Sequence, residues 1–427
     1  MSFFRFLAYA LRNTLVGSKV YYAWMGFLLV LSSFGVWGFY HHITVGLITT
    51  GMRDQVSWGI SIGTYAFLIG VATSVIILLI PGYIYNWKPA KNIVIVGEIL
   101  ALSALTMCIL FVMTDIGRPE RFWHMLPFLG ILNLPSSLMG WNAVVMPAYF
   151  FFDLFIIIYI LYKAYVGKGY NEKFVYGYVI FMIFWAIVAH SITAFIFNVL
   201  PAHPYWNASI LVPRFIATAL ASGGAILLLV LQMVRKIGQV EIDDEAVFKI
   251  ADILNYVMFL NLLLFLSEVI MIFTSENQRF THMRYYFVGL RSYAWVAIFC
   301  NFSAYFLLMF RKLRENYFYL NIACVFIFIG IFIEKGIGLV IPGYIPTPLG
   351  EVYHYTPTLG EWAMMAGISG IGLIVATVFL KIAIPLVMTS KTSTKENKPT
   401  VDEPASTTPV LSLGEQVKEE EAVGGTT

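Results

Sequence analysis

"SWGISIGTYAFLIGVATSVIILLI", residues 57–80, runs for 24 residues without a charged side chain. At a rise of 1.5 Å per residue, a helix of this length extends about 36 Å. The hydrocarbon core of a bilayer is about 30 Å thick. A strand of a membrane barrel would alternate apolar and polar residues over about 10 positions, and this stretch does not. It therefore predicts a transmembrane helix.

The rest of the chain has the same character. Hydrophobic residues make up 59% of the sequence and charged residues 12%, about half the charged fraction of a soluble domain. Backbone groups in lipid must be paired internally, which favours helices for every apolar run. We predict an all-α, polytopic membrane protein, with a transmembrane domain over residues 1–388. Its ten spans are expected at residues 20–40, 57–80, 93–113, 141–162, 174–197, 212–234, 250–273, 293–310, 318–341 and 362–386.

The distribution of positive charge predicts the orientation. If the N-terminus is cytoplasmic, 19 of the 27 Lys and Arg residues fall in cytoplasmic segments, as the positive-inside rule requires. Both termini are therefore expected in the cytoplasm. The first residues carry no signal-peptide cleavage pattern, so the N-terminus is expected to be retained. Residues 389–427 are polar and rich in Ser, Thr and Pro, which predicts a disordered cytoplasmic tail.

The residues that usually hold redox metals lack the required grouping. Cys108, Cys300 and Cys324 lie in separate spans, whereas iron–sulfur clusters need grouped thiolates. Only His190 lies well inside a span, so there is no facing His pair for haem. No phosphate-binding loop is present. We expect no metal, haem or iron–sulfur cluster bound by this chain, and no nucleic-acid partner.

Ionisable residues inside the membrane are costly and are therefore candidates for function. The sequence places six of them in the spans: Glu98, Asp153, His190, Glu268, Glu334 and Lys335. Helical spacing groups some of these with other polar residues on two faces. The two faces carry Asn142, Tyr149 and Asp153, and Asn261, Glu268 and Ser275. These faces predict a polar chamber near the outer surface, with a proton relay toward Asp153 and Glu98.

Each of these residues also has a structural interpretation. A protonated carboxyl group can simply hydrogen-bond a neighbouring helix, and the Lys335 side chain can extend outward to the membrane surface.

The predicted outer loops combine charged and aromatic residues. "DIGRPERFWHM", residues 115–125, follows the third span, and we expect Asp115 and Arg118 to pair there. Residues 202–215 and 341–362 have a similar composition. Together these loops predict a docking surface on the outer face. A role for residues 115–125 that is only structural, at the helix end, is the alternative.

Four stretches together resemble the NrfD/PsrC family of quinone-reactive membrane subunits. They are "WGISIGTYAFLIGVATS" (58–74), "DIGRPERFWHM" (115–125), "SSLMGWNAVVMPAY" (136–149) and "HSITAFIFNVLPAHPYWNASILVPRFIATALASGGA" (190–225). Ten spans resemble the DsrP, HmcC and HybB branch of that family, and DsrP most of all.

The resemblance implies a multi-pass protein of the prokaryotic cell membrane that works only within a multisubunit complex. Such subunits bind menaquinone near the periplasmic side and exchange electrons with a periplasmic iron–sulfur subunit. Multihaem cytochrome c and further membrane and cytoplasmic subunits are the other expected partners, in a complex of sulfate or sulfite reduction. A chain without a metal does redox work through a bound organic cofactor and an external electron partner. Proton translocation is a further expectation.

The resemblance and the polar pattern together give the candidate site residues. The expected proton-carrying residues are His190, Asp153, Glu268, Glu98 and Glu334. The expected quinone pocket is lined by Trp58, Tyr65, Trp141, Asn142, His190 and Arg214, with Asp115 and Arg118 at its entrance. The family's quinone-contacting His at the start of the first core span has no counterpart in "DQVSWGISIG", residues 54–63.

Two other classes of function remain open at the level of sequence. The intramembrane carboxylates could couple ion flow to transport, although no internal repeat typical of transporters is found. The chain could also be a structural anchor for periplasmic partners, a role that does not require buried carboxylates.

Overall fold

The computed structural model describes residues 2–126, 129–274, 284–345 and 350–388. Within these residues, ten helices are long and apolar enough to cross a membrane, which confirms the predicted number and order of spans. They are α2 (Lys19–Val45), α3 (Ile60–Thr73) with α4 (Ile76–Leu79), α5 (Lys88–Asp115), α6 (Leu138–Tyr165), α7 (Glu172–Asn198), α8 (Leu211–Gly238), α9 (Asp244–Thr274), α11 (Arg291–Met309), α13 (Tyr317–Lys335) with α14 (Ile337–Gly343), and α15 (Leu359–Ala383). The predicted tail lies outside the described residues.

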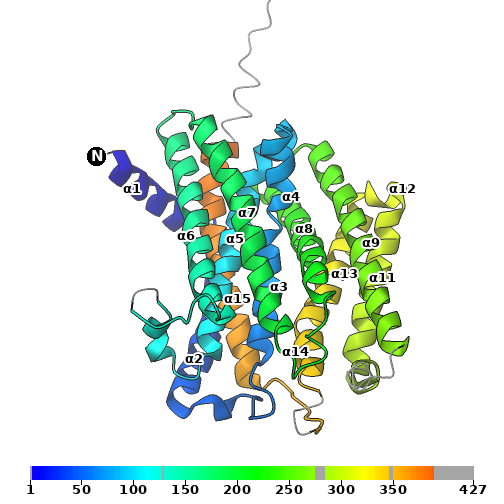
Figure 1. Cartoon of the computed structure of the whole chain (residues 1–427). Helices are drawn as coiled ribbons and strands as arrows, with labels where there is room; N and C mark the ends of the chain where they lie inside the picture. The colour runs from blue at the N-terminus through cyan, green and yellow to red at the C-terminus, as the bar shows by residue number, and fades with distance from the viewer. Residues whose placement is uncertain (1, 127–128, 275–283, 346–349, 389–427) are drawn as a thin grey trace, which may run out of the picture.

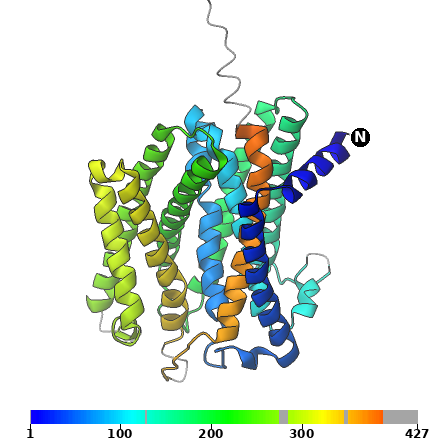
Figure 2. The same cartoon turned by 180° about the vertical axis from the view of Figure 1, so that it is seen from behind.

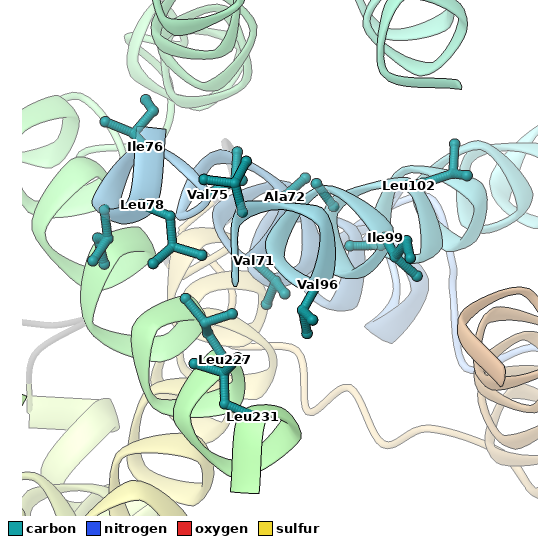
Figure 3. Packing of buried hydrophobic residues seen from close by; sticks show 14 of the residues in the cluster. Val71, Ala72, Val75, Ile76, Leu78, Val96, Ile99, Leu102, Leu227 and Leu231 are labelled. Carbon is teal, nitrogen blue, oxygen red and sulfur yellow. The ribbon is translucent and has the colours of Figure 1, made fainter. Parts of the chain in front are cut away.

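The centre of the bundle is built from α3, α5 and α8, which contact one another along their lengths. Figure 3 shows how Val71 and Val75, Val96 and Ile99, and Leu227 from these helices pack together. Lipid tails are as apolar as these side chains, so close packing rather than water exclusion holds the helices together.

The remaining spans surround this centre in three groups. α6 and α7 pack beside α3 and α5, whereas α9, α11 and α13 form a second group beside α8. α2 and α15 pack against each other at the periphery and reach the centre through α5 (Figure 2). The central helices therefore join the three groups of spans, and polar residues from different groups can meet there.

The contact between α2 and α15 depends on facing glycines. A Cβ atom added to Gly35 would lie 2.7 Å from the Cα atom of Gly367. Small residues at such crossings let two backbones approach closely, so these positions fix the separation of the two helices.

Two spans are interrupted in ways that the apolar pattern did not predict. The second span continues past α4 into a π turn, Ile80–Ile84, that begins next to Pro81. The ninth breaks between α13 and α14 at Gly336, whose φ and ψ are −81° and −92°. An additional amphipathic helix, α1 (Ser2–Leu15), is too short to span a bilayer and projects from the bundle in Figure 1.

The two ends of the bundle differ in structure. The loop-rich end carries residues 46–59, 116–126, 199–210 and 350–358, at the bottom of Figure 1. The N-terminal end carries α1 and the turns at residues 166–171 and 239–243. The sequence predicts that the N-terminal end faces the cytoplasm, and the loop-rich end then faces outward.

Candidate functional site: three buried polar clusters

The first buried group, which we call the hydroxyl cluster, joins α3, α6 and α7. The Tyr65 hydroxyl group donates to Asn142 Oδ1 at 2.8 Å and lies 3.0 Å from Thr193 Oγ1. Asn142 is in the first turns of α6 and Thr193 in the last turns of α7, so the cluster lies toward the loop-rich end. Tyr65 and Asn142, both predicted pocket residues, are thus brought together, whereas Thr193 was not predicted.

Trp141, another predicted pocket residue, turns away from this cluster. Its relative exposure is 38%, and its Nε1 atom donates to the Pro135 carbonyl oxygen at 3.1 Å. A residue next to Asn142 on a helix points about 100° away from it, which explains the separation.

The second group is the carboxyl pair of Glu98 on α5 and Asp153 on α6. Both side chains are buried and lie within hydrogen-bonding reach of each other. Neither oxygen of Asp153 has a donor among the described residues. Two carboxyl groups can hydrogen-bond only if one of them carries a proton, and an unpaired charge here would be costly. The pair is therefore suited to hold and release a proton.

The predicted stripe on α6 connects these two groups. Asn142 contacts Tyr65, Tyr149 donates to the Ala72 carbonyl oxygen at 3.3 Å, and Asp153 faces Glu98. All three side chains thus face α3 or α5, as their seven- and four-residue spacing predicts.

The third group, which we call the charged cluster, is centred on Arg214 of α8. Its guanidinium group forms ion pairs with Glu268 of α9 and, at 2.7 Å, with Glu334 of α13. Asn301 Nδ2 also donates to Glu334, at 3.1 Å. Arg214 is thus buried and neutralises two carboxylates, and its place in the quinone pocket stays a prediction.

Lys335 belongs to the same cluster, and the interpretation of an outward-extended side chain is wrong. Its side chain is buried, and Nζ donates to the Phe215 carbonyl oxygen at 3.1 Å. The ammonium group also lies 4.3 Å from the centre of the Phe215 ring, a cation–π contact.

His190 connects the hydroxyl cluster to the charged cluster. Its Nε2 atom lies 2.9 Å from the same Phe215 carbonyl oxygen. A carbonyl only accepts, so Nε2 carries a proton. The other ring nitrogen, Nδ1, is buried without a hydrogen-bond partner among the described residues. His190 is one turn from Thr193 and thus lies between the two clusters.

The second predicted stripe is partly described. Asn261 and Glu268 both lie on the buried face of α9, whereas Ser275 lies outside the described residues. Asn261, Asn301 and Glu334 line a cavity of about 10 Å³, which is room for about one water molecule. Both side-chain polar atoms of Asn261 lack a partner among the described residues, so a water molecule there would satisfy them.

A cluster of aromatic residues lies at the loop-rich end of the bundle. Trp58, a predicted pocket residue, contacts Phe197 and Trp206 with ring centres 5.3 and 5.6 Å apart. His203 Nδ1 lies 2.8 Å from the Gly343 carbonyl oxygen. Burial lowers the pKa of His203 below its usual value, which favours the neutral ring.

The predicted pairing of Asp115 with Arg118 is wrong. Arg118 is exposed and contacts Glu120 at 3.4 Å, because the chain leaves the helix after Asp115 and begins a 3-10 turn at Pro119. Asp115 instead lies near the Gly59 backbone and the Glu361 carboxylate. Arg118 is thus at the surface and Asp115 at the inner side of the loop.

Two residues in this region were not predicted as site residues. Glu361 is buried and accepts hydrogen bonds from Gly51 N at 2.7 Å and from the Tyr355 hydroxyl group at 2.5 Å. It also forms a capping box with Thr358, a pattern that the sequence "TLGE" could have revealed. His42 is buried near Glu361, and its ring nitrogens have no partner among the described residues. The sequence placed His42 at a span end, whereas α2 continues to Val45.

Comparison with known proteins supplies the family. Residues 48–347 match the family model described as polysulphide reductase, NrfD. A selenate reductase subunit of Mesobacillus selenatarsenatis is 23% identical over 411 residues, covering 85% of this chain and 93% of that protein. A putative dimethyl sulfoxide reductase membrane subunit of Halobacterium salinarum is 25% identical, over 48% of this chain and 50% of its own length.

A third relative is the Hdr-like menaquinol oxidoreductase integral membrane subunit of Archaeoglobus fulgidus. It is 24% identical, over 52% of this chain and 53% of its own length. The family match includes the helices that carry all three buried polar clusters, from α3 through α13. The chain therefore belongs to the NrfD family of polytopic membrane proteins.

Proposed function

We propose that this chain is the membrane subunit of a respiratory redox complex and that it binds menaquinone near its loop-rich end. Two relatives are named as menaquinol or menaquinone oxidoreductase subunits. The observation that carries the proposal is the hydroxyl cluster, which places the Tyr65 hydroxyl group, Asn142 and Thr193 together in an apolar bundle. A quinone needs hydrogen-bonding groups for its two carbonyl oxygens and an apolar passage for its tail.

The groups in and beside this cluster fit a quinone head group. Tyr65 and Thr193 supply hydroxyl groups, and His190 has a buried Nδ1 atom without a partner among the described residues. Bound menaquinone supplies a carrier of two electrons and two protons. The His190 ring can exchange a proton at Nδ1 while its Nε2–H bond to Phe215 keeps the ring in place. The carboxyl pair is the store for protons that travel through α5 and α6.

We further propose that the loop-rich end faces the periplasm and docks an iron–sulfur subunit. Multihaem cytochrome c and other membrane and cytoplasmic subunits would complete the complex. Relatives named as subunits of several reductases support a multisubunit assembly. The sequence motifs favour a complex of sulfate or sulfite reduction of the DsrP type.

The experiment compares Tyr65→Phe and His190→Ala with the unaltered protein, each purified with its co-purifying subunits. Tyr65→Phe removes one hydroxyl group and keeps the ring, so we expect weaker quinol binding and a higher KM for a soluble naphthoquinol. His190→Ala removes the proton-exchanging ring, so quinol-dependent reduction of the partner should be lost while assembly survives.

The matched control is Tyr256→Phe on α9, because Tyr256 is 72% exposed and lies far from the cluster in sequence and on another helix. It should leave turnover unchanged. Normal quinol turnover in both Tyr65→Phe and His190→Ala would rule out this site.

A further inference from the structure

The carboxyl pair lies deep in the bundle, and the groups that could connect it to water lie toward the N-terminal end. The π turn Ile80–Ile84, which includes Tyr83, packs against α5 at that end. Gly82 makes this approach possible, since a Cβ atom there would lie 3.2 Å from Lys91 N. π turns within helical spans often occur at functional sites. The local backbone is thus shaped to hold Tyr83 beside α5.

Lys91 and Glu172 connect Tyr83 to the surface. Lys91 Nζ lies 5.4 Å from the centre of the Tyr83 ring and 6.0 Å from that of Tyr170. It also lies 3.5 Å from Glu172 Oε1, and the exposures of the two side chains are 22% and 78%. The side chains of Tyr83 and Tyr170 are within hydrogen-bonding reach of each other. Glu172 is therefore exposed, whereas Lys91 and the two tyrosines are partly buried.

Helical phase links this group to the carboxyl pair. Lys91 and Glu98 are seven residues apart on α5 and therefore share a face. Glu98 lies about 10 Å deeper along the helix. Tyr83 interacts electrostatically with both Tyr170 and Glu98, and Glu98 contacts Asp153. Protonatable groups that interact in succession thus lie between the surface of the N-terminal end and Asp153.

We propose that Tyr170 and Tyr83 form a proton inlet from the N-terminal end to the carboxyl pair. The inlet deepens the proposed function, because it names the side of the membrane from which protons reach Glu98 and Asp153. Each hydroxyl group releases its proton to the next group inward as it accepts one from the outer side. The net result is the transfer of one proton from water to a carboxylate, and the tyrosines end as they began.

A cavity of about 460 Å³ at the same end is a competing entrance. It is lined by Pro89, Asn92 and Ile93 of α5, together with Arg235 and residues 239–244. Glu98 is five, six and nine residues from these three α5 positions, so it faces more than 100° away from each of them. The cavity therefore lies on the wrong face of α5 to serve the carboxyl pair.

The test uses Tyr83→Phe and Tyr170→Phe in the protein with its co-purifying subunits, reconstituted in liposomes and driven with a soluble naphthoquinol. Both variants keep the ring and its packing and lose only the hydroxyl group. We expect a loss of proton uptake from the N-terminal side, measured with a pH-sensitive dye, relative to the electrons transferred. Tyr83→His, which restores a protonatable group, should recover part of the uptake.

Tyr85→Phe is the matched control, because Tyr85 follows the same π turn and is 76% exposed. It should leave the proton-to-electron ratio unchanged.

The variant Asp153→Asn distinguishes failure of the proton inlet from failure of the proton role of the carboxyl pair. If Asp153→Asn lowers the ratio but Tyr83→Phe and Tyr170→Phe do not, the inlet is elsewhere and the function stands. If Asp153→Asn also leaves the ratio unchanged, the proton role of the pair fails as well.

Discussion

Arg214 shows how a single residue can join several helices. It lies on α8 and bonds carboxylates from α9 and α13, and its guanidinium plane lies 5.0 Å from the centre of the Phe265 ring. A guanidinium group offers donors in a planar fork and can therefore bond two carboxylates at once. Sequence analysis identified Arg214, Glu268 and Glu334 separately, but it could not show that they meet, because the three lie on different helices.

Removal of Arg214 should therefore destabilise the bundle. Arg214→Met removes the guanidinium group that pairs with two buried carboxylates, and the loss of one partner of a buried ion pair costs about 3–5 kcal/mol. We expect a lower Tm in detergent, measured by intrinsic fluorescence. Glu268→Gln combined with Glu334→Gln in the same chain should restore part of the loss. An unchanged Tm for Arg214→Met would mean that the carboxylates are not charged.

The candidate site residues differ in how well the sequence alone predicted whether they are buried in the bundle. Glu98, Asp153 and His190 were predicted because ionisable groups are rare in apolar spans. Tyr65 and Asn142 were predicted from the family resemblance. All five are buried or partly buried in the bundle. Arg118 and Trp141 were predicted from motifs and lie at the surface. Which way a side chain at a helix end points depends on the turn that follows, and spacing alone does not determine that turn.

At the level of elements, the apolar runs predicted all ten spans, because a bilayer requires a minimum helix length. The interruptions at the π turn and at Gly336 were missed, since they arise from local backbone geometry rather than from hydropathy. The outermost pair, α2 and α15, packs through small residues. Of the glycines in α2, Gly35 faces α15 closely, whereas Gly26 has nothing within 4 Å of an added Cβ atom.

The difference between Gly35 and Gly26 predicts opposite effects of alanine at two positions of the same helix. Gly35→Ala places a methyl group against the backbone of Gly367 and should destabilise the protein by about 1–3 kcal/mol. Gly26→Ala should be neutral or stabilise by up to about 1 kcal/mol, since Ala is the better helix former. Thermal unfolding in detergent measures both. Equal Tm values for the two variants would contradict the close α2–α15 contact.

At the level of the whole molecule, the two ends have different roles in the proposals. The loop-rich end carries the aromatic cluster and lies nearest the hydroxyl cluster, which makes it the expected docking side for an electron-transfer partner. The N-terminal end carries the proposed proton inlet. Electron exchange with the partner and proton uptake would thus take place at opposite ends of this chain.

Cross-linking can test this assignment of the two ends. A photoreactive amino acid at Ala202, which is exposed in the segment 199–210, should cross-link to a co-purifying iron–sulfur subunit. The same amino acid at Lys168, exposed at the N-terminal end, should not. Mass spectrometry of the products identifies the partner. Cross-links from Lys168 alone would reverse the orientation proposed here.

The position of the carboxyl pair has an electrical consequence. Asp153 lies 12 residues before the end of α6, close to the middle of that helix. One elementary charge that crosses a whole membrane exchanges about 2.3 kcal/mol with the field for every 100 mV. A proton that stops at Asp153 has crossed about half of that distance, so each such step would exchange about 1 kcal/mol with the field at 100 mV. The rate of proton transfer to the carboxyl pair should therefore depend on the membrane potential.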